Sequence, residues 1–213
     1  MTEHAAVQAT SSLKVGALLK ASISRAKLDQ PVSVIAGLSQ AAKALAAVAL
    51  ARAGRGTMLL IVPNDKDVEQ ITNDARFFYR AVEGATSKAV DCAILPFPSL
   101  QIDPYREMQP HFRVTSARAH TLHAIATGSA RLVIASVAAS LQRLNTPARI
   151  RRASLELKAG SEIEPQALAD LLVDAGFTRE DPVDAHGEFS IRGGIVDVFP
   201  AGDIEPVRIE FVG

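Results

Sequence analysis

The sequence of 213 residues predicts an α/β fold with a parallel sheet, followed by a smaller α+β domain. Between residues 32 and 145, short apolar runs alternate with segments of helical length, which is typical of a parallel sheet covered by helices. After residue 147 the apolar residues recur with period two, as in half-buried strands. Apolar residues make up 48% of the chain, enough for domains with their own cores.

The first part is expected to alternate strands with helices. The expected strands are Val32–Ile35, Met58–Val62, Ala93–Leu95 and Leu132–Ala135. The expected helices cover about residues 40–53, 65–82, 115–127 and 137–143. Two helix starts have local support, because Asp65 and Asp67 suit the positive end of a helix dipole and Thr115 and Ser116 can cap a helix.

Proline and glycine punctuate the remaining segments. Prolines at positions 96, 98, 104 and 110 predict an ordered surface excursion from the sheet. The run "SLELKAGS" predicts a strand with a turn, and "PQALADLLVDAG" predicts a helix that begins at its proline and ends at its glycine. We therefore expect a helical or flexible lead-in over 1–30, an α/β domain over 31–147 and an α+β domain over 148–213, truncated within the strand-like run "RIEFVG".

Composition limits the partners of the chain. The 23 basic and 23 acidic residues balance, so a charged partner has to be sought in local patches. Cys92, in the apolar run "VDCAIL", is expected to be buried, and a lone cysteine excludes an intramolecular disulfide. The sequence contains no recognisable signal peptide or membrane-spanning stretch, so we expect a monomeric, cytoplasmic chain.

Residues 37 to 44, "GLSQAAKA", lie where a nucleotide-binding loop would be expected. Such a loop has the pattern G-x-x-x-x-G-K-[ST], in which glycine amides and the lysine bind phosphates and the hydroxyl binds magnesium. The chain keeps Gly37 and Lys43 but has Ala42 at the second glycine and Ala44 in place of the hydroxyl. Without that magnesium ligand we expect no hydrolysis and no nucleotide cofactor.

Two interpretations of this loop stay open. A strand followed by an alanine-rich helix can resemble such a loop by chance, or the loop is a degenerate P-loop in a P-loop-NTPase-like domain. Its place in a βαβ unit closed by "MLLIVP" favours the second interpretation. The runs "LLIVPND" and "LVIAS" also lack an apolar strand followed directly by Asp-Glu, so a second metal-binding carboxylate is missing.

The segment "HGEFSIRGGIVDVFP" predicts a β-hairpin. Gly193-Gly194 suits a two-residue turn, which would pair Arg192 with Ile195 and Ser190 with Asp197. Arg192 then lies on a face with apolar neighbours and with Asp197 diagonally within reach. A structural Arg–Asp pair and an interface arginine are both compatible with this pattern.

These runs resemble a known family. "GEFSIRGGIVDVFP" followed by "PVRIEFVG" resembles the motif shared by bacterial transcription-repair coupling factor (Mfd) and the excision-repair protein UvrB, in the domain that both use to bind UvrA. "FPSLQIDPYREMQPHFRVTSARAHTL", "RLVIASVAASLQRL" and "AGLSQAAKAL" resemble the N-terminal region of the coupling factor rather than UvrB. The resemblance covers roughly residues 30 to 213 and implies a UvrB-like module without ATPase activity.

The resemblance also implies roles for single residues. The arginines with which the family contacts UvrA fall on Arg179, in "GFTRED", and on Arg192, in "SIRGG". Ser190 stands where UvrB has a further arginine. Guanidinium groups suit such contacts because they bind carboxylates in two-pronged, partly desolvated geometry. Phe189, Glu188 and Phe199 are further candidates for UvrA contact, although packing within the domain is the favoured interpretation for these three residues.

Two other groups of side chains can be interpreted either as structural or as functional. Three histidines, with no cysteine or clear carboxylate to complete a metal site, are expected to be solvated or capping residues: His111, His120 and His123. Three arginines near the domain boundary can form a solvated face or contact phosphate: Arg149, Arg151 and Arg152.

The sequence therefore predicts a non-catalytic module that recruits UvrA by mimicking UvrB in nucleotide excision repair of transcribed strands. The alternatives are an active UvrB-like ATP-dependent helicase fragment and a DNA-binding module that uses the arginine cluster. For the full-length family protein, an ATP-dependent DNA translocase, the resemblance implies RNA polymerase and DNA as further partners, and no membrane.

Overall fold

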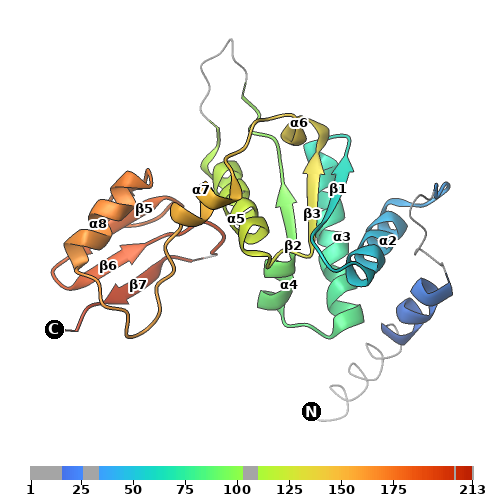
Figure 1. Cartoon of the computed structure of the whole chain (residues 1–213), viewed down its shortest axis with the longest axis horizontal. Helices are drawn as coiled ribbons and strands as arrows, with labels where there is room; N and C mark the ends of the chain where they lie inside the picture. The colour runs from blue at the N-terminus through green and yellow to red at the C-terminus, as the bar shows by residue number, and fades with distance from the viewer. Residues whose placement is uncertain (1–15, 26–33, 103–109, 204, 213) are drawn as a thin grey trace. The chain divides into compact units, whose positions relative to one another are not determined.

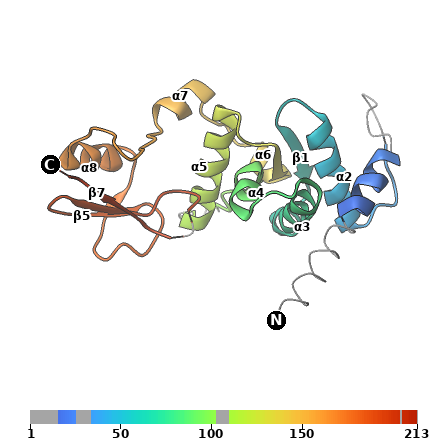
Figure 2. The same cartoon turned by 90° about the horizontal axis from the view of Figure 1, so that it is seen from below.

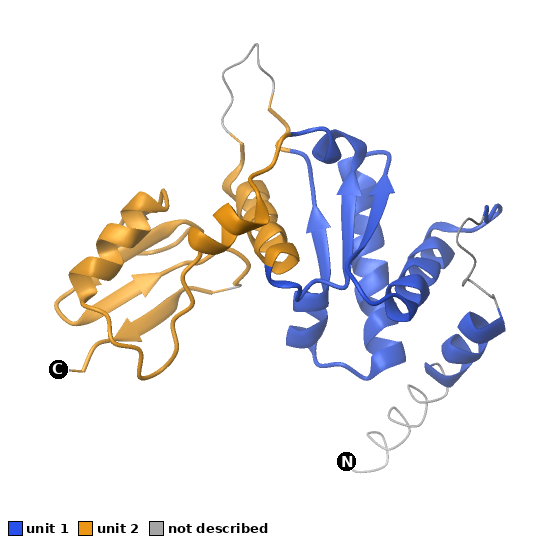
Figure 3. Cartoon of the chain, in the orientation of Figure 1, with its two compact units in different colours: residues 1–99, 127–142 blue, residues 100–126, 143–213 orange. Residues whose placement is uncertain are grey.

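The chain forms two compact units in a computed structural model that describes residues 16–25, 34–102, 110–203 and 205–212 (Figure 1). Unit 1 comprises residues 1–99 and 127–142, and unit 2 comprises residues 100–126 and 143–213 (Figure 3). Residues 16–25 are helical, within the predicted lead-in. The units differ from the predicted domains in assigning residues 100–126 to the second part of the chain.

Unit 1 contains a parallel sheet, which we call sheet A. Its strands, in the spatial order β1-β3-β2, are β1 (Met58–Val62), β3 (Leu132–Ser136) and β2 (Ile94–Phe97). The central strand β3 is buried along its whole length, as expected for a strand paired on both sides. The predicted parallel sheet is therefore confirmed, with β1 at the predicted bounds.

Helices cover sheet A and supply its core. They are α2 (Gln40–Ala53), α3 (Asp65–Glu83), α4 (Ser87–Ala93) and α6 (Val137–Ser140). The Asn64 side chain caps α3 by accepting a hydrogen bond from the Asp67 amide at 3.0 Å, and Gly84 ends the helix at a φ of 67°. Three alanines and Val48 of α2 pack with α3, α4 and the strands around buried Ile134.

Three local predictions in unit 1 were wrong or shifted. Val34 and Ile35 lie outside any strand and are 95% and 45% exposed, whereas residues 32 and 33 lie outside the described residues. A β-branched run becomes a strand only where it finds a strand to pair with. The third strand begins at Ile94 rather than at residue 93, because residues 87–93 form the unpredicted α4, and α6 ends at Ser140 rather than at 143.

Cys92 is exposed, so its predicted burial is wrong. It lies on α4, whose buried residues are Val90 and Ala93, three positions apart. Helical periodicity then turns the intervening Cys92 toward solvent. The run "VDCAIL" contains the end of a helix and the start of a strand, and a short apolar run cannot separate these two structures.

Unit 2 combines three helices with a mixed sheet, which we call sheet B. The helices are α5 (Phe112–Thr127), α7 (Pro147–Arg152) and α8 (Pro165–Asp174). The strands, in spatial order, are β4 (Thr178–Arg179), β5 (Glu188–Arg192), β6 (Ile195–Val198) and β7 (Val207–Glu210). No helix in the described part of the chain is long and apolar enough to cross a membrane.

The predicted hairpin is confirmed in its register. Arg192 pairs with Ile195 and Ser190 with Asp197 in the antiparallel β5-β6 ladder. Gly193 has a φ of 60°, as the first residue of a two-residue hairpin turn requires. The predicted α8 is also confirmed, with Pro165 in its first turn.

Two predictions in unit 2 were wrong. The run "SLELKAGS" contains a turn but no strand. The helix α5 begins at Phe112, so Thr115 and Ser116 do not cap it; instead the His111 ring accepts the Arg113 amide at Nδ1, 3.2 Å away. His111 thus has a capping role, one of the two roles expected of the histidines.

The glycine at 202 gives a stability prediction. Gly202 has a φ of 89°, and a Cβ there would lie 1.5 Å from His120 Nδ1. We expect Gly202→Ala to lower the free energy of unfolding of unit 2 by about 2–4 kcal/mol, from backbone strain and steric overlap together. Gly160→Ala is the control, since Gly160 has a φ of 85° but nothing within 4 Å, and should cost only about 1 kcal/mol. Urea unfolding followed by circular dichroism compares the two, and equal effects would contradict the predicted overlap.

Candidate partner-binding surface

Sheet B has one face covered by α8. Phe189 and Val198 pack against Ala169 of α8 in the core of this unit, and Phe189 is only 1% exposed. Figure 2 shows the sheet nearly edge on, with α8 along one side. Because strand residues alternate between faces, the residues between these core positions lie on the opposite face, which we call the outer face.

Arg192 lies on the outer face and is held by an aspartate from a loop. Its Nε donates to Asp181 Oδ2 at 2.8 Å, and its Nη2 donates to the other carboxylate oxygen. Arg192 therefore forms a structural Arg–Asp pair, but its partner is Asp181 and the expected pairing with Asp197 is wrong. The Asp181 carboxylate raises the pKa of the Arg192 guanidinium above its ordinary value, mainly through this hydrogen bond. The Arg192 side chain nonetheless stays 64% exposed.

Asp197 has a partner of its own on the next strand. Arg208 lies directly opposite Asp197 in the β6-β7 ladder, and its Nε and Nη2 donate to the two carboxylate oxygens at 2.7 and 2.9 Å. Both arginines and both aspartates line one hollow of about 580 Å³ on the outer face, together with Ser190. The outer face is thus a ladder of two bidentate ion pairs with rigid guanidinium positions.

The Asp197 pair predicts a pH dependence of stability. The hydrogen bond from Arg208 lowers the pKa of Asp197 below its ordinary value of 3.8. A lowered folded-state pKa stabilises the fold above the unfolded-state pKa, and this contribution is lost as the pH falls through the folded-state value. We expect Asp197→Asn to lower the unfolding free energy at pH 7 by less than about 1 kcal/mol, because the pair is near the surface. Urea titrations at a series of pH values from 7 downward through the acid range test this, and a difference that stays constant over the whole series would contradict the linkage.

Arg179 lies at the edge of the same sheet. It is opposite Phe189 in the β4-β5 register, and therefore on the α8 side by alternation. Its Nη2 lies 3.5 Å from the carbonyl oxygen of Ile191, the residue before Arg192. The structure thus brings Arg179 and Arg192 to the same end of β5, with Arg179 at the edge and Arg192 on the outer face.

The remaining candidate residues have structural contacts. Phe199 is 7% exposed, and the centroid of its ring lies 4.0 Å from the centroid of the His186 ring. Glu188 accepts the Asp184 and Ala185 amides at 2.9 and 2.8 Å, which fixes the loop before β5. With Phe189 in the core, the exposed candidates are the two arginines.

Sequence reasoning missed Asp181 and Arg208 on this surface. Both could have been suspected, since Asp181 follows Arg179 closely in "TRED" and Arg208 sits in the alternating run "PVRIEFVG". The sequence does not show that Asp181 lies beside Arg192 or that Arg208 lies opposite Asp197. The segments that join these residues to β5 and β6 are longer than a tight turn, so turn length does not fix the register.

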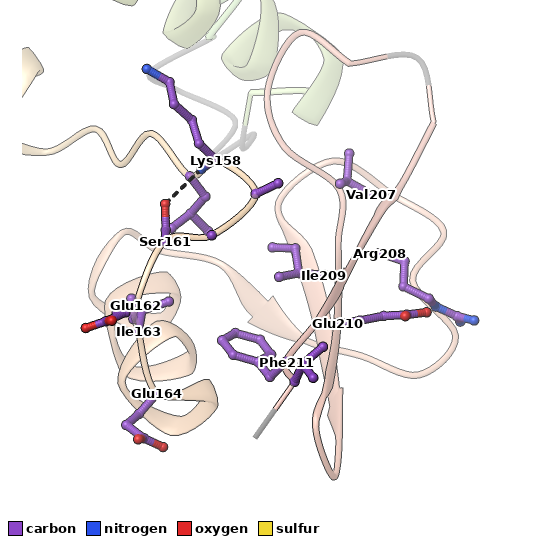
Figure 4. Close-up of a pocket in the computed structure, with 14 residues that line it drawn as sticks. Lys158, Ser161, Glu162, Ile163, Glu164, Val207, Arg208, Ile209, Glu210 and Phe211 are labelled. Atoms are coloured by element: carbon purple, nitrogen blue, oxygen red, sulfur yellow. Dashed lines mark hydrogen bonds between the residues drawn. The ribbon is translucent and has the colours of Figure 1, made fainter.

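A second hollow borders β7 on the other side. It measures about 1010 Å³ and lies between residues 157–164 and β7. Ile209 and Phe211 point toward the 157–164 segment, whereas Arg208 and Glu210 point away from it (Figure 4). Its lining mixes apolar and charged side chains, and among the described residues Arg208 alone lines both hollows.

The loop at 37–44 uses its amides within the protein. The helix α2 already begins at Gln40, and the Ser39 side chain and carbonyl accept the Ala42 and Lys43 amides at 3.4 and 2.9 Å. Ala44 is fully buried in the core, at the position where a working loop presents a hydroxyl to magnesium. Gly37 keeps a φ of 76°. At the end of β3, where a metal-binding acid is absent, Ser136 caps α6.

No group of side chains in the described ranges could hold a metal ion. The three arginines of the cluster are half of the six residues of α7, and Thr146 caps this helix by accepting the Arg149 amide at 3.4 Å.

Comparison with known proteins identifies a family that the chain resembles. A family model described as the UvrB interaction domain matches residues 155–213, the segment that forms α8 and sheet B. The chain is 33% identical over 178 residues to the transcription-repair-coupling factor of Bacillus subtilis (strain 168), covering 83% of this chain and 14% of that protein.

Other relatives carry the same name. The transcription-repair-coupling factor of Escherichia coli (strain K12) is 26% identical over 174 residues, which cover 82% of this chain and 14% of that protein. The protein of the same name from Staphylococcus aureus (strain USA300) is 29% identical over 182 residues, covering 85% of this chain and 15% of the relative. The chain thus spans only 14 to 15% of the length of these relatives.

Proposed function

Since the chain belongs to the N-terminal, UvrB-like region of the bacterial transcription-repair-coupling factors, we propose that it is a non-catalytic module that recruits UvrA by mimicking UvrB. Its role is nucleotide excision repair of transcribed strands. The whole protein has RNA polymerase and DNA as further partners and acts in the cytoplasm, and the chain itself is monomeric.

One observation carries this proposal. The match to the UvrB interaction domain, over residues 155–213, coincides with the part of the chain that presents Arg192 on an uncovered sheet face. An exposed arginine already held in a bidentate pair can exchange one carboxylate for another without losing its hydrogen bonds. Its fixed position also lowers the entropy lost when a partner binds.

The test is direct binding to purified UvrA. We expect the chain, immobilised by its N-terminus, to bind UvrA in biolayer interferometry, and we expect purified UvrB to compete for the same site. Binding that UvrB does not displace would refute mimicry while leaving recruitment intact. Failure of UvrA to bind at all would refute the proposal.

We also propose that the degenerate loop binds no nucleotide. Its Ala42 and Lys43 amides donate to Ser39, and Ala44 lies in the core, so two amide donors and the magnesium ligand of a working loop are lacking. We expect the melting temperature to stay unchanged with ATP and magnesium at about 1 mM, because a ligand stabilises a fold only when it exceeds its dissociation constant. A nucleotide-dependent rise would favour the alternative of an active UvrB-like ATPase.

A further inference from the structure

The chain is electrically neutral but its charges are strongly segregated. Residues 108–155 contain seven arginines and no lysine, aspartate or glutamate. Residues 156–213, which are the match to the UvrB interaction domain without its first residue, contain 13 acidic and four basic residues. One segment therefore has a net charge of +7 and the next a net charge of −9.

Three of the seven arginines have structural roles. Arg118 is 6% exposed and lies within α5. Arg131 donates from Nη2 to the carbonyl oxygens of Ala51 and Gly54, at 2.9 and 3.0 Å, which closes the end of α2. Arg151 donates from Nη1 to the carbonyl oxygen of Ala126 at 2.7 Å. This last bond holds α7 against the C-terminal end of α5, within unit 2.

The other arginines around α7 project from a fixed helix. Arg149 and Arg152 are three residues apart and so share one face of α7, and Arg143 precedes the helix by four residues. All three are exposed, and within the described residues none of them has an ion-pair partner. They stay unpaired although the same unit carries an excess of carboxylates.

We propose that Arg143, Arg149 and Arg152 form a contact surface for the phosphate backbone of double-stranded DNA. Guanidinium groups bind phosphate oxygens with two parallel hydrogen bonds, and exposed arginines without carboxylate partners are available for this. Arg149 and Arg152 lie about 4.5 Å apart along the helix axis, of the same order as the phosphate repeat of about 3.4 Å along one DNA strand. Because the proposed contacts are to phosphate oxygens and not to base edges, the contact is independent of base sequence.

This surface lies outside the candidate UvrA-binding face and adds a function to the proposed one. Arg192 and Arg208 are neutralised by aspartates on the outer face of sheet B, whereas the α7 arginines are not. A polyanion is therefore directed to α7 and repelled by the acidic sheet domain. The chain would contact DNA at one place and a protein at another.

The test measures binding of the whole chain to a fluorescein-labelled duplex of about 20 base pairs by anisotropy, at salt concentrations from about 20 to 200 mM. With three phosphate contacts, the logarithm of the binding constant should fall against the logarithm of salt with a slope of about −3. The double variant Arg149→Glu/Arg152→Glu should weaken binding at least about tenfold at low salt and reduce the slope by about 2.

A charge-matched control separates this surface from overall charge. Arg55→Glu/Arg80→Glu changes the net charge equally, at exposed positions of unit 1, and should leave DNA binding within about twofold of the wild type. Both double variants should keep the wild-type melting temperature and UvrA affinity, which separates failure of this proposal from failure of the proposed function. Absence of wild-type binding at about 20 mM salt, or equal losses in the two double variants, would overturn the proposal. Competition by poly-glutamate at equal charge would overturn it too, because the surface would then accept an acidic protein as well as DNA.

Discussion

Arg192→Ala is expected to weaken UvrA binding by at least about 30-fold, or about 2 kcal/mol, as for an interface hot spot. Arg192 is an exposed arginine within the match to the UvrB interaction domain, and its Nε donates to Asp181 at 2.8 Å. The fold should be little affected, since a surface ion pair contributes less than about 1 kcal/mol. Biolayer interferometry gives the affinity, and urea unfolding verifies that the variant is folded.

Two further variants sharpen this experiment. Arg192→Lys keeps the charge but loses the bidentate fork, so it should recover only a small part of the lost affinity. Arg80→Ala removes an exposed arginine from unit 1 and should bind UvrA like the wild type. If Arg192→Ala binds UvrA as tightly as Arg80→Ala does, Arg192 does not contact UvrA, and the outer face is not the UvrA-binding surface.

The hairpin that carries Arg192 was predictable because its determinants are local. Gly193-Gly194 specifies a two-residue turn, and turn length fixes the register of β5 and β6. The same register places Asp197 on the outer face, as predicted. The arginine partners were not predictable, since Asp181 and Arg208 reach that face from segments whose path depends on the packing of the whole unit.

In the parallel sheet, prediction succeeded where period and capping agreed. The strand β1 has the predicted bounds, and α3 begins at Asp65, where Asp65 and Asp67 indicate. It failed for residues 34 and 35, because strand formation needs a partner strand as well as β-branched residues. The helix α7 was missed although "TP" at 146–147 is a helix-start signal, with a threonine cap and a proline in the first turn.

The candidate site shows the limit of inference by resemblance. The motif makes both Phe189 and Arg192 candidate contacts, whereas alternation predicts that they lie on opposite faces and that Phe189 packs. The structure has Phe189 on the α8 face and Arg192 on the outer face, as alternation predicts. Burial, which the motif does not encode, therefore divides the candidates into core and surface.

Phe189→Ala is expected to lower the free energy of unfolding of unit 2 by about 3–5 kcal/mol, a large part of the total stability of a small domain. The reason is that Phe189 is 1% exposed and packs against Ala169 and Val198, so its removal leaves a cavity between α8 and sheet B. Leu171→Ala is the control in the same unit, because Leu171 is 48% exposed and its loss should cost less than about 1 kcal/mol. Urea unfolding followed by circular dichroism measures both.

A third variant separates the packing role of Phe189 from a contact role. Phe189→Leu keeps most of the buried apolar volume, so we expect it to remain folded and to bind UvrA with nearly the affinity of the wild type. A folded Phe189→Leu that loses UvrA would instead show that the ring reaches the partner, which requires α8 to move away from the sheet on binding. In that case the interface would include the core of unit 2, and the exposed arginines alone would not explain recognition.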